Sequence, residues 1–321
     1  MQEISYRISD DYKCRALTSS NNTEIIVGTQ SLNHTNKIIV LNYDDENLSL
    51  DLISSFDYGH EVWLISSSLS NPSNLLIATK DSIELLEYNS EIITKDSLSL
   101  PSRATSFSWD ENLYCSTNSQ IFSIDLQTQT LTPVLEKPNI SVCRIDPHHK
   151  FLLAIGYSDS LSIYDNRDKS NRYTISPIHG GNVLDLDFNP NNPYHLASSG
   201  KDYAIKFWDI RKQGCLKSIV EHSHYVWQIK YNAFHDQLIV SASSDNSIGL
   251  HRVVSASSAP VDESFFEKES DLMVLKVDSF EDSVYAVTWL SGEAWHFASV
   301  SYDGKVVVTA VPSEEKYKIL L

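Results

Sequence analysis

Apolar and polar residues alternate along most of the chain in short runs. The clearest run spans His179 to Arg211, HGGNVLDLDFNPNNPYHLASSGKDYAIKFWDIR. Val, Ile, Leu, Phe and Trp dominate the runs, and turn signals such as Asn189-Pro190 and Asp303-Gly304 separate them. This pattern is typical of strands of about five residues. The chain is therefore predicted to be an all-β protein.

One internal spacing repeats along the chain. In five segments an apolar anchor residue precedes an aspartate by 19 residues; the pairs are Val62 and Asp81, Ile140 and Asp159, Val183 and Asp202, Val226 and Asp245, and Val284 and Asp303. Two weaker copies run from Cys14 to Asp44 and from Arg103 to Asp125, the second with Asn118 in place of the turn aspartate. Seven units in 321 residues give a period of about 46 residues, which four-stranded propeller blades have.

We therefore predict a single domain over residues 1–321, a seven-bladed β-propeller. The blades are expected near residues 12–47, 59–89, 99–129, 138–168, 179–212, 221–253 and 280–311. The longer step between the last two anchors indicates an acidic insertion at about 254–281. Its serines and charges are typical of a solvated loop. The alternative is a docking segment in which Phe265, Phe266, Met273 and Leu275 become ordered on a partner.

The charge balance argues against one class of partner. The chain has 25 basic and 42 acidic side chains, hence a formal net charge of −17. A nucleic-acid-binding surface needs a basic cluster, and the sequence has none of that size, so no nucleic-acid partner is expected. Residues 261–282 hold eight carboxylates but only Lys268 and Lys276, and this stretch is a possible steering surface for a basic partner.

No segment of the sequence is typical of secretion or membrane insertion. The start, MQEISYRISDDYK, has no apolar region behind a basic end, and apolar runs never approach the roughly eighteen residues of a membrane span. The cysteines are far apart and form no CxxC pair; they are Cys14, Cys115, Cys143 and Cys215. We expect a propeller that is monomeric by itself, in a reducing intracellular compartment.

Residue types found in hydrolases recur at fixed positions of the repeat. The two sets are His179, Ser198 and Asp202, and His222, Ser241 and Asp245. A catalytic triad needs one convergent, solvent-exposed set, whereas a set that recurs with the repeat indicates a structural role. We therefore predict that the protein has no catalytic residues and is not an enzyme.

The HG dipeptide at 179–180, the turn Asp202 and the Trp208-Asp209 pair resemble the WD-repeat family. The resemblance implies that His179, Ser198, Asp202 and Trp208 form an internal hydrogen-bond chain, which His222, Ser241 and Asp245 repeat. Other blades depart from the family pattern and are expected to depend more on apolar packing. Their departures are Tyr58 and Phe280 in place of the His, and His251-Arg252 and Thr309-Ala310 in place of Trp-Asp.

No metal or cofactor site is predicted. His222 and His224 can share one face of a strand, but no third ligand is near them in the sequence. The string from His60 to Trp63, HEVW, lacks the second His of a zinc-protease helix, and Gly180-Gly181 is too short for a phosphate loop.

Large aromatic residues recur directly after the anchor position, where the channel of a propeller has its entrance. Trp63, Trp227 and Tyr285 occupy this position, and Lys201 and Tyr302 precede turn aspartates that are expected at the same rim. We predict these five residues as a candidate partner-binding rim, because Tyr and Trp commonly anchor interfaces. The alternative is that the aromatic residues pack between blades.

Whole strings of the second half resemble the EARP- and GARP-complex-interacting proteins. They are DLDFNPNNPYHLAS from Asp185, KFWDIR from Lys206, EHSHYVW from Glu221, HDQL from His235, EDSVYAV from Glu281, SYDG from Ser301 and the terminal VPSEEKYKILL; VGTQSL from Val27 and YDDEN from Tyr43 extend the likeness to the first blade. The resemblance implies a non-catalytic cytoplasmic adaptor, peripherally associated with endosomes and the trans-Golgi network. Tethering-complex subunits would be its partners, in endosomal recycling and retrograde traffic.

The closing strand of the ring has two candidates. The segment from Ile4 to Ile8 and the C-terminal KYKILL could each supply the outer strand of the last blade. The sequence does not decide between them, and the segment left over would be free to bind another molecule.

The sequences at the ends of two consecutive blades indicate an alternative function. Tyr164-Asp165-Asn166-Arg167 and Trp208-Asp209-Ile210-Arg211 resemble the Asp-x-Arg endings of substrate receptors for cullin-RING ubiquitin ligases. In that alternative Arg167 and Arg211 pair with carboxylates of a ligase adaptor. The competing interpretation is that each arginine forms a salt bridge within its own blade.

Overall fold

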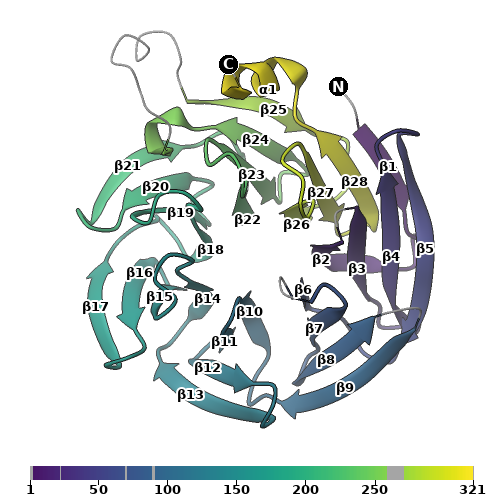
Figure 1. The fold of residues 1–321 in the computed structure, drawn as a ribbon, viewed down its shortest axis with the longest axis horizontal. Helices are drawn as coiled ribbons and strands as arrows, with labels where there is room; N and C mark the ends of the chain where they lie inside the picture. Colours follow the sequence, from purple (N-terminus) through teal and green to yellow (C-terminus); the bar gives the residue numbers. More distant parts are fainter. Residues whose placement is uncertain (1–2, 22, 69–70, 89–90, 259–270, 321) are drawn as a thin grey trace.

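The computed structural model describes residues 3–21, 23–68, 71–88, 91–258 and 271–320. Seven four-stranded antiparallel sheets stand radially around a central channel, as Figure 1 shows. The prediction of a seven-bladed β-propeller is confirmed. We number the blades in chain order and call the strands of each blade first to fourth from the channel outward.

The first four blades use consecutive strands. They are β2 (Lys13–Ser20), β3 (Glu24–Gln30), β4 (Asn36–Asp44) and β5 (Ser49–Tyr58) in blade 1; β6 (Leu64–Ser67), β7 (Asn74–Ala78), β8 (Ser82–Tyr88) and β9 (Ile92–Ser99) in blade 2; β10 (Ala104–Trp109), β11 (Leu113–Thr117), β12 (Gln120–Asp125) and β13 (Thr130–Glu136) in blade 3; and β14 (Ile140–Ile145), β15 (Leu152–Tyr157), β16 (Ser160–Asp165) and β17 (Ser170–Ile175) in blade 4.

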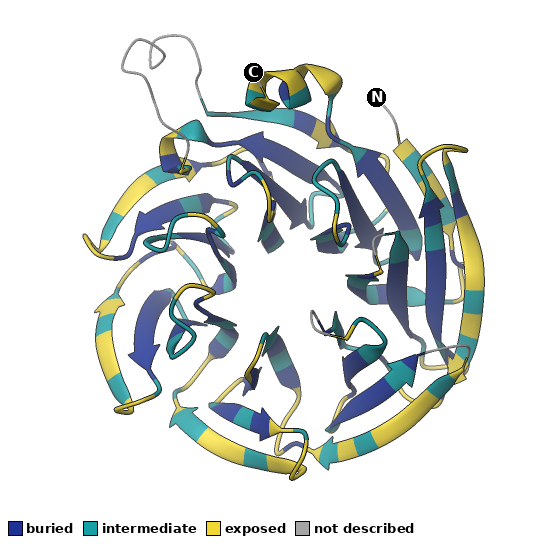
Figure 2. Ribbon diagram, in the orientation of Figure 1, coloured by how far each residue is buried: buried dark blue, intermediate teal, exposed yellow. Residues whose placement is uncertain are grey.

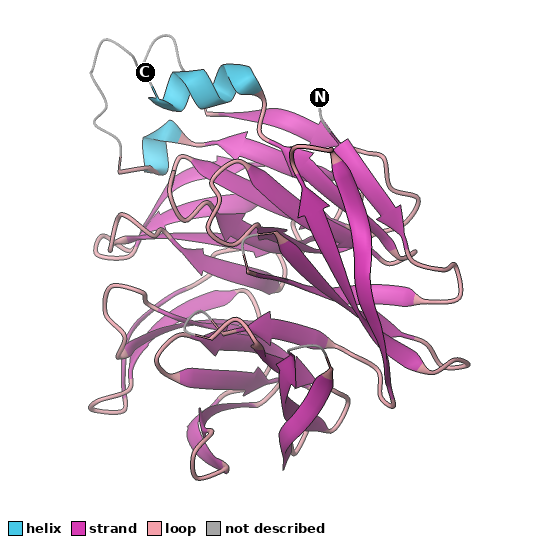
Figure 3. Cartoon of the chain, turned by 45° about the vertical axis from the view of Figure 1, so that its right-hand side comes forward, coloured by secondary structure: helices cyan, strands magenta, loops and turns pink. Residues whose placement is uncertain are grey.

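The remaining blades include the N-terminal strand. They are β18 (Val183–Phe188), β19 (His195–Gly200), β20 (Ile205–Asp209) and β21 (Gly214–Ile219) in blade 5; β22 (Val226–Tyr231), β23 (Leu238–Ser243), β24 (Ile248–Arg252) and β25 (Leu272–Val277) in blade 6; and β26 (Val284–Trp289), β27 (His296–Ser301), β28 (Lys305–Ala310) and β1 (Glu3–Arg7) in blade 7. Two short helices, η1 (Val254–Ala256) and α1 (Ser313–Leu320), lie at the outer edge near β25 (Figures 1 and 3).

The N-terminal strand closes the ring. β1 pairs antiparallel with β28, with Tyr6 opposite Val306. Residues 316–320 of the KYKILL segment lie in helix α1 instead of a strand, and Glu315 of this helix forms an ion pair with Arg252 of β24 at 3.1 Å. The alternative of a closing C-terminal strand is therefore wrong.

The core lies between neighbouring blades. The second and third strands are buried on both faces; every residue of β16 and β23 is buried, for example. Fourth strands such as β9 and β17 alternate between half-buried and exposed residues because only one of their faces packs against the ring, as the yellow outer bands of Figure 2 show. Each apolar cluster joins side chains from two blades, as in the cluster that contains Val240 of blade 6 and Phe297 of blade 7.

A β-bulge recurs near the start of the first strand in six of the blades. The pairing with the second strand skips one residue there; the skipped residues are Arg15, Thr105, Ser141, Leu184, Trp227 and Tyr285. A bulged residue has no partner in the ladder, and the bulge redirects its side chain. These side chains all line the central channel.

The observed strands correct the predicted blade spans and the predicted extent of the insertion. The predicted spans hold the first three strands of each blade, whereas the fourth strands lie mainly in the intervals between the spans. The acidic insertion predicted at about 254–281 is also too long, because Leu272–Val277 form the fourth strand of blade 6 and pair with β24. Residues 259–270, with Phe265 and Phe266, lie outside the described residues. Within the described ranges, no helix has the length and apolar character needed to cross a membrane.

Candidate functional site

The polar set of blade 5 forms one continuous chain inside the blade. The His179 ring has its Nδ1 2.7 Å from Asp202 Oδ1 and its Nε2 2.8 Å from Ser198 Oγ. The Trp208 indole Nε1 donates to the same Ser198 hydroxyl at 2.9 Å. A Cβ on Gly200 would lie 2.6 Å from the His179 ring, so only glycine leaves room for this histidine.

Blade 6 repeats the arrangement with one change. His222 lies 3.0 Å from Asp245 Oδ2 and 2.8 Å from Ser241 Oγ. His251 takes the place of the tryptophan, and its Nε2 lies 2.8 Å from Ser241 Oγ. Burial is the largest influence on the pKa of His251 and lowers it, although Glu221 acts in the opposite direction.

Neither set presents its serine hydroxyl to solvent. Ser198 and Ser241 are fully buried, with an exposed fraction of 0% each. Each hydroxyl already contacts two ring nitrogens, which hold the strands of one blade together. Each set connects the strands inside its own blade. The two sets therefore lie in different blades and do not converge on a common substrate position.

Blades without the histidine use other contacts. The Tyr58 hydroxyl donates to Glu84 Oε2 at 2.6 Å and so links blade 1 to blade 2. Phe280 is buried in the apolar cluster between blades 6 and 7, where Lys305 Nζ lies 5.6 Å from its ring centroid. The polar and the apolar replacement both fill the position at which blades 5 and 6 have a histidine.

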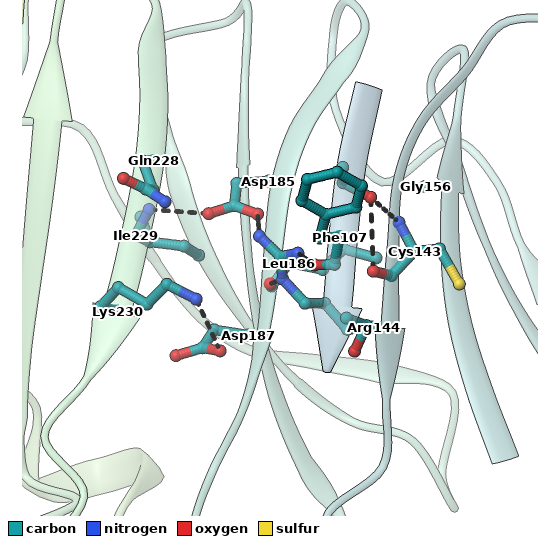
Figure 4. A network of polar contacts seen from close by, with 12 residues as sticks. Phe107, Cys143, Arg144, Gly156, Asp185, Leu186, Asp187, Gln228, Ile229 and Lys230 are labelled. Carbon is teal, nitrogen blue, oxygen red and sulfur yellow. Dashed lines mark hydrogen bonds and ion pairs between the residues drawn. The ribbon is translucent and has the colours of Figure 1, made fainter. Parts of the chain in front are cut away.

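Polar residues on the first strands link successive blades around the channel (Figure 4). Arg144 of blade 4 donates to Asp185 of blade 5 at 2.6 Å, and Asp185 accepts the Ile229 N–H of blade 6 at 3.2 Å. Asp187 and Lys230 form the next ion pair at 3.6 Å. Burial is the largest influence on the pKa of Asp187 and raises it, with Lys230 acting against burial.

The channel, with a volume of about 900 Å³, has an aromatic and cationic mouth at one face. We call this the entrance face; it is the end of the ring where the first strands begin and the turns between second and third strands lie. The Arg15 guanidinium lies 4.0 Å from the ring centroid of Tyr285 and 5.7 Å from those of Trp63 and Trp227. Arg103 lies 4.2 Å from the Trp63 ring.

An aromatic series continues from the mouth over blades 5 to 7. Successive ring centroids are 6.0 Å apart for Tyr203 and Tyr225, 6.2 Å for Tyr225 and Trp227, 5.2 Å for Trp227 and Tyr285, and 5.7 Å for Tyr285 and Tyr302. Lys201 lies over Tyr225 and Lys13 over Tyr302, both at 5.6 Å. We call the series with these two lysines the aromatic rim.

The structure brings the five predicted rim residues to this face. Trp227, Tyr285 and Tyr302 are in direct succession, Lys201 joins through Tyr225, and Trp63 joins through Arg15. The sequence reasoning missed Arg15, although it directly follows Cys14, the anchor of the first repeat. It also missed Arg103, which precedes the first strand of blade 3.

Arg167 and Arg211 lie at the opposite face, in the turns between third and fourth strands. Arg167 donates to Asp165 at 2.8 Å and lies 3.5 Å from the Phe151 ring centroid. Arg211 donates to Asp209 at 3.2 Å and lies 3.9 Å from the Tyr194 ring centroid. Each arginine is thus paired in its own blade, yet 60% and 54% of the two side chains stay exposed.

No group of three or more His, Cys, Asp and Glu side chains in the described ranges has an arrangement that could hold a metal ion. His224 stacks on Tyr203 at a centroid distance of 5.8 Å, and His222 contacts Asp245. The two histidines therefore have different partners.

Comparison with known proteins identifies the family. A family model described as the EIPR1 beta-propeller matches residues 8–251. The chain is 32% identical over 376 residues to EARP and GARP complex-interacting protein 1 of Macaca fascicularis and of Homo sapiens, and 33% identical to the EARP-interacting protein homolog of Gekko japonicus. Each alignment covers 97% of this chain and 97% of the relative. The chain therefore belongs to the EIPR1 beta-propeller family.

Proposed function

We propose that this protein is a non-catalytic adaptor that binds multisubunit tethering complexes of the EARP and GARP type. The observation that carries the proposal is its similarity, over 97% of its length, to proteins named for interaction with these complexes. The buried position of Ser198 and Ser241 supports a structural rather than a catalytic role for the repeated polar sets.

The aromatic rim, with Trp63, is the proposed interaction surface. Trp and Tyr bury large areas with few rotatable bonds, and interface energy commonly concentrates on such residues. Tyr203 and His224 are exposed, and Tyr225, Trp227, Tyr285 and Tyr302 are half-buried, so the rings are held in place but still accessible. Lys201 adds a cation at the edge of this surface.

The proposed role belongs to the cytoplasm. A tethering complex would recruit the propeller peripherally to endosomes and the trans-Golgi network, where it would act in endosomal recycling and retrograde traffic. We propose a monomeric propeller whose partners are tether subunits. Its net charge of −17 supports a partner other than nucleic acid.

Purification of the tagged protein from its own cells, under mild conditions, tests the proposal. Tethering-complex subunits are expected among the companions that mass spectrometry identifies. The variants Trp227→Ala and Tyr302→Ala are expected to reduce their recovery about tenfold each, as for interface anchors. Phe234→Ala is the matched control, because this exposed aromatic residue lies between β22 and β23 at the opposite face. Recovery of no tether subunit with the wild-type protein would overturn the proposal.

A second candidate function is that of a substrate receptor of a cullin-RING ubiquitin ligase. The exposed guanidinium groups of Arg167 and Arg211 favour it, because Phe151 and Tyr194 hold them at the surface of two consecutive blades. An exposed arginine held in this way can donate hydrogen bonds to a second carboxylate, one from a ligase adaptor.

Charge reversal separates the two functions. The double variant Arg167→Glu and Arg211→Glu is expected to abolish association with a ligase adaptor and to leave tether subunits bound. A ligase adaptor recovered without tether subunits would support the second candidate against the first. Loss of tether subunits from the double variant, with an unchanged melting temperature, would assign tether binding to the opposite face.

A further inference from the structure

Two arginines at the channel mouth differ from all the others in this chain. Of its eight arginines, six form an ion pair with a carboxylate; these are Arg7, Arg144, Arg167, Arg172, Arg211 and Arg252. For Arg15 and Arg103, no carboxylate among the described residues lies within 4.0 Å of the guanidinium nitrogens. The exception is notable in a chain with 42 acidic residues, where chance alone would often supply a partner.

Arg144, deeper in the same channel, shows how this fold supplies hydrogen-bond acceptors to an arginine with a structural role. Its guanidinium donates to Phe107 O at 2.6 Å, Leu186 O at 3.0 Å and Asp185 Oδ1 at 2.6 Å. Arg15 and Arg103 form no such bond with the described part of the chain and have ring contacts instead. A ring face attracts the positive charge but accepts few of the five N–H donors of a guanidinium, so most donors at the mouth remain available.

The surroundings of Arg15 do not favour a second cation. Burial is the largest influence on the pKa of Arg15 and lowers it, Tyr285 opposes this effect, and the nearby charge of Arg103 lowers it further. Both guanidinium groups contact the Trp63 ring, at 5.7 Å and 4.2 Å from its centroid. The Trp63 Nε1–H is buried and has no acceptor among the described residues. An anion at this position would offset the repulsion between the two guanidinium groups and accept hydrogen bonds from them and from the Trp63 Nε1–H.

We propose that Arg15 and Arg103, with the Trp63 ring between the strands that carry them, bind a carboxylate side chain from an acidic segment of a protein partner. Arginine binds carboxylates in a bidentate, charge-assisted manner, which supplies both affinity and direction. The residues that flank this carboxylate would lie against Tyr285 and Trp227, which line the same channel mouth. The inference rests on the proposed adaptor function and adds the chemistry of the partner segment.

Charge complementarity is the argument for an acidic partner. Of the Lys and Arg side chains in the described ranges, more than half form ion pairs with carboxylates of the same protein. Lys13, Arg15, Arg103 and Lys201 gather on one face, and none of them forms an ion pair with a described carboxylate. An acidic segment would meet repulsion over much of a surface with net charge −17 and attraction here. Such a contrast determines where a partner binds more than how tightly it binds.

Synthetic peptides test this inference. Overlapping 15-residue peptides that span the sequences of the tether subunits, in unmodified and phosphorylated forms, are immobilised and probed with the full-length protein. The wild-type protein is expected to bind unmodified peptides rich in Asp and Glu, and replacement of those acids by Asn and Gln should abolish binding. Arg103→Glu and Arg15→Gln should each weaken binding of the same peptides about tenfold or more.

The controls keep the result interpretable. Arg103 is exposed, so its reversal is expected to leave the melting temperature unchanged. Lys212→Gln removes a charge from an exposed turn at the opposite face and should leave binding unchanged. Equal binding by the arginine variants, or binding to phosphorylated peptides alone, would overturn the inference. Recovery of tether subunits from cells by both wild type and Arg103→Glu would overturn it while leaving the adaptor function in place.

Discussion

Arg144 of blade 4 and Asp185 of blade 5 form an ion pair of 2.6 Å on the wall of the channel. The same guanidinium donates to Phe107 O of blade 3, and Asp185 accepts from Ile229 N–H of blade 6. One ion pair therefore joins four consecutive blades. Asp185 is buried, so its charge depends on these donors for stabilisation.

Loss of one partner of this pair is expected to destabilise the ring. Arg144→Met should lower the free energy of unfolding by about 3–5 kcal/mol, because a buried carboxylate loses its charged partner. Urea denaturation followed by tryptophan fluorescence measures the change. The double variant Arg144→Met and Asp185→Leu should recover part of the loss, because it leaves no unpaired charge. Equal stability of Arg144→Met and wild type would show that the pair contributes nothing net.

The hydroxyl of Ser198 is predicted to be structural. Ser198→Ala removes the group that contacts both His179 and Trp208, so two buried ring nitrogens lose their partner. The expected cost is about 1–3 kcal/mol, measured by thermal or urea unfolding. Ser223→Ala, at an exposed position, is the matched control and should have almost no effect. A hydrolase activity that Ser198→Ala destroyed in a folded protein would contradict the structural role.

Stability is predicted to fall in acid through the turn aspartates of blades 5 and 6. Burial would raise the pKa of Asp202 and Asp245, but the contacts with His179 and His222, together with backbone N–H groups, outweigh it and hold both pKa values well below the ordinary 3.8. A carboxyl group with a lowered pKa in the folded state stabilises the protein fully above its unfolded pKa. This contribution decreases as the pH falls below about 3.8 and is lost once the pH passes the folded pKa.

Urea denaturation at pH 7, 5, 4 and 3 measures this dependence. The free energy of unfolding of the wild type should decrease between pH 5 and pH 3. The double variant Asp202→Asn and Asp245→Asn should be less stable at pH 7 and should lose less stability over the same interval. An identical slope for variant and wild type would assign the acid sensitivity to other carboxylates.

Closure by the N-terminal strand makes a further prediction. Deletion of residues 1–8 exposes the edge of β28 and removes the strand that pairs with it, so the melting temperature should fall by several degrees, as for losses of a few kcal/mol. Proteolysis should then cut first within blade 7. A synthetic peptide of residues 1–12, added in excess, should restore part of the melting temperature. Unchanged stability after the deletion would mean that blade 7 does not need its fourth strand.

The repeat could be predicted from the sequence because it depends on local chemistry. The anchor residues begin the first strands of blades 4 to 7, and in blades 5 and 6 the turn aspartates 19 residues later contact the histidines that precede those strands, as Asp202 contacts His179. Both features are determined within one blade. The fourth strands are harder to recognise, because segments such as Thr130–Glu136 have one solvated face and no fully buried residue.

The identity of the closing strand could not be predicted, because it depends on a contact between residues that are far apart in the sequence. Glu3–Arg7 and KYKILL both contain alternating residues, and only the pairing with β28 distinguishes them. One local signal did favour a helix for the second segment, because Glu314 and Glu315 occupy its first turn, where acidic side chains stabilise the helix dipole. The convergence of Arg15 with Arg103 could not be predicted, because these residues come from blades 1 and 3.

The pairing of β1 with β28 also determines the order in which the protein can be completed during synthesis. The strand that emerges among the first residues must wait, unpaired, until Lys305–Ala310 have been made. Blades 1 to 6 can each fold as soon as their four consecutive strands are present, whereas blade 7 depends on the contact of longest range in the molecule. The strand β1 therefore stays unpaired for most of the synthesis, which is the period of greatest exposure to aggregation or to chaperones.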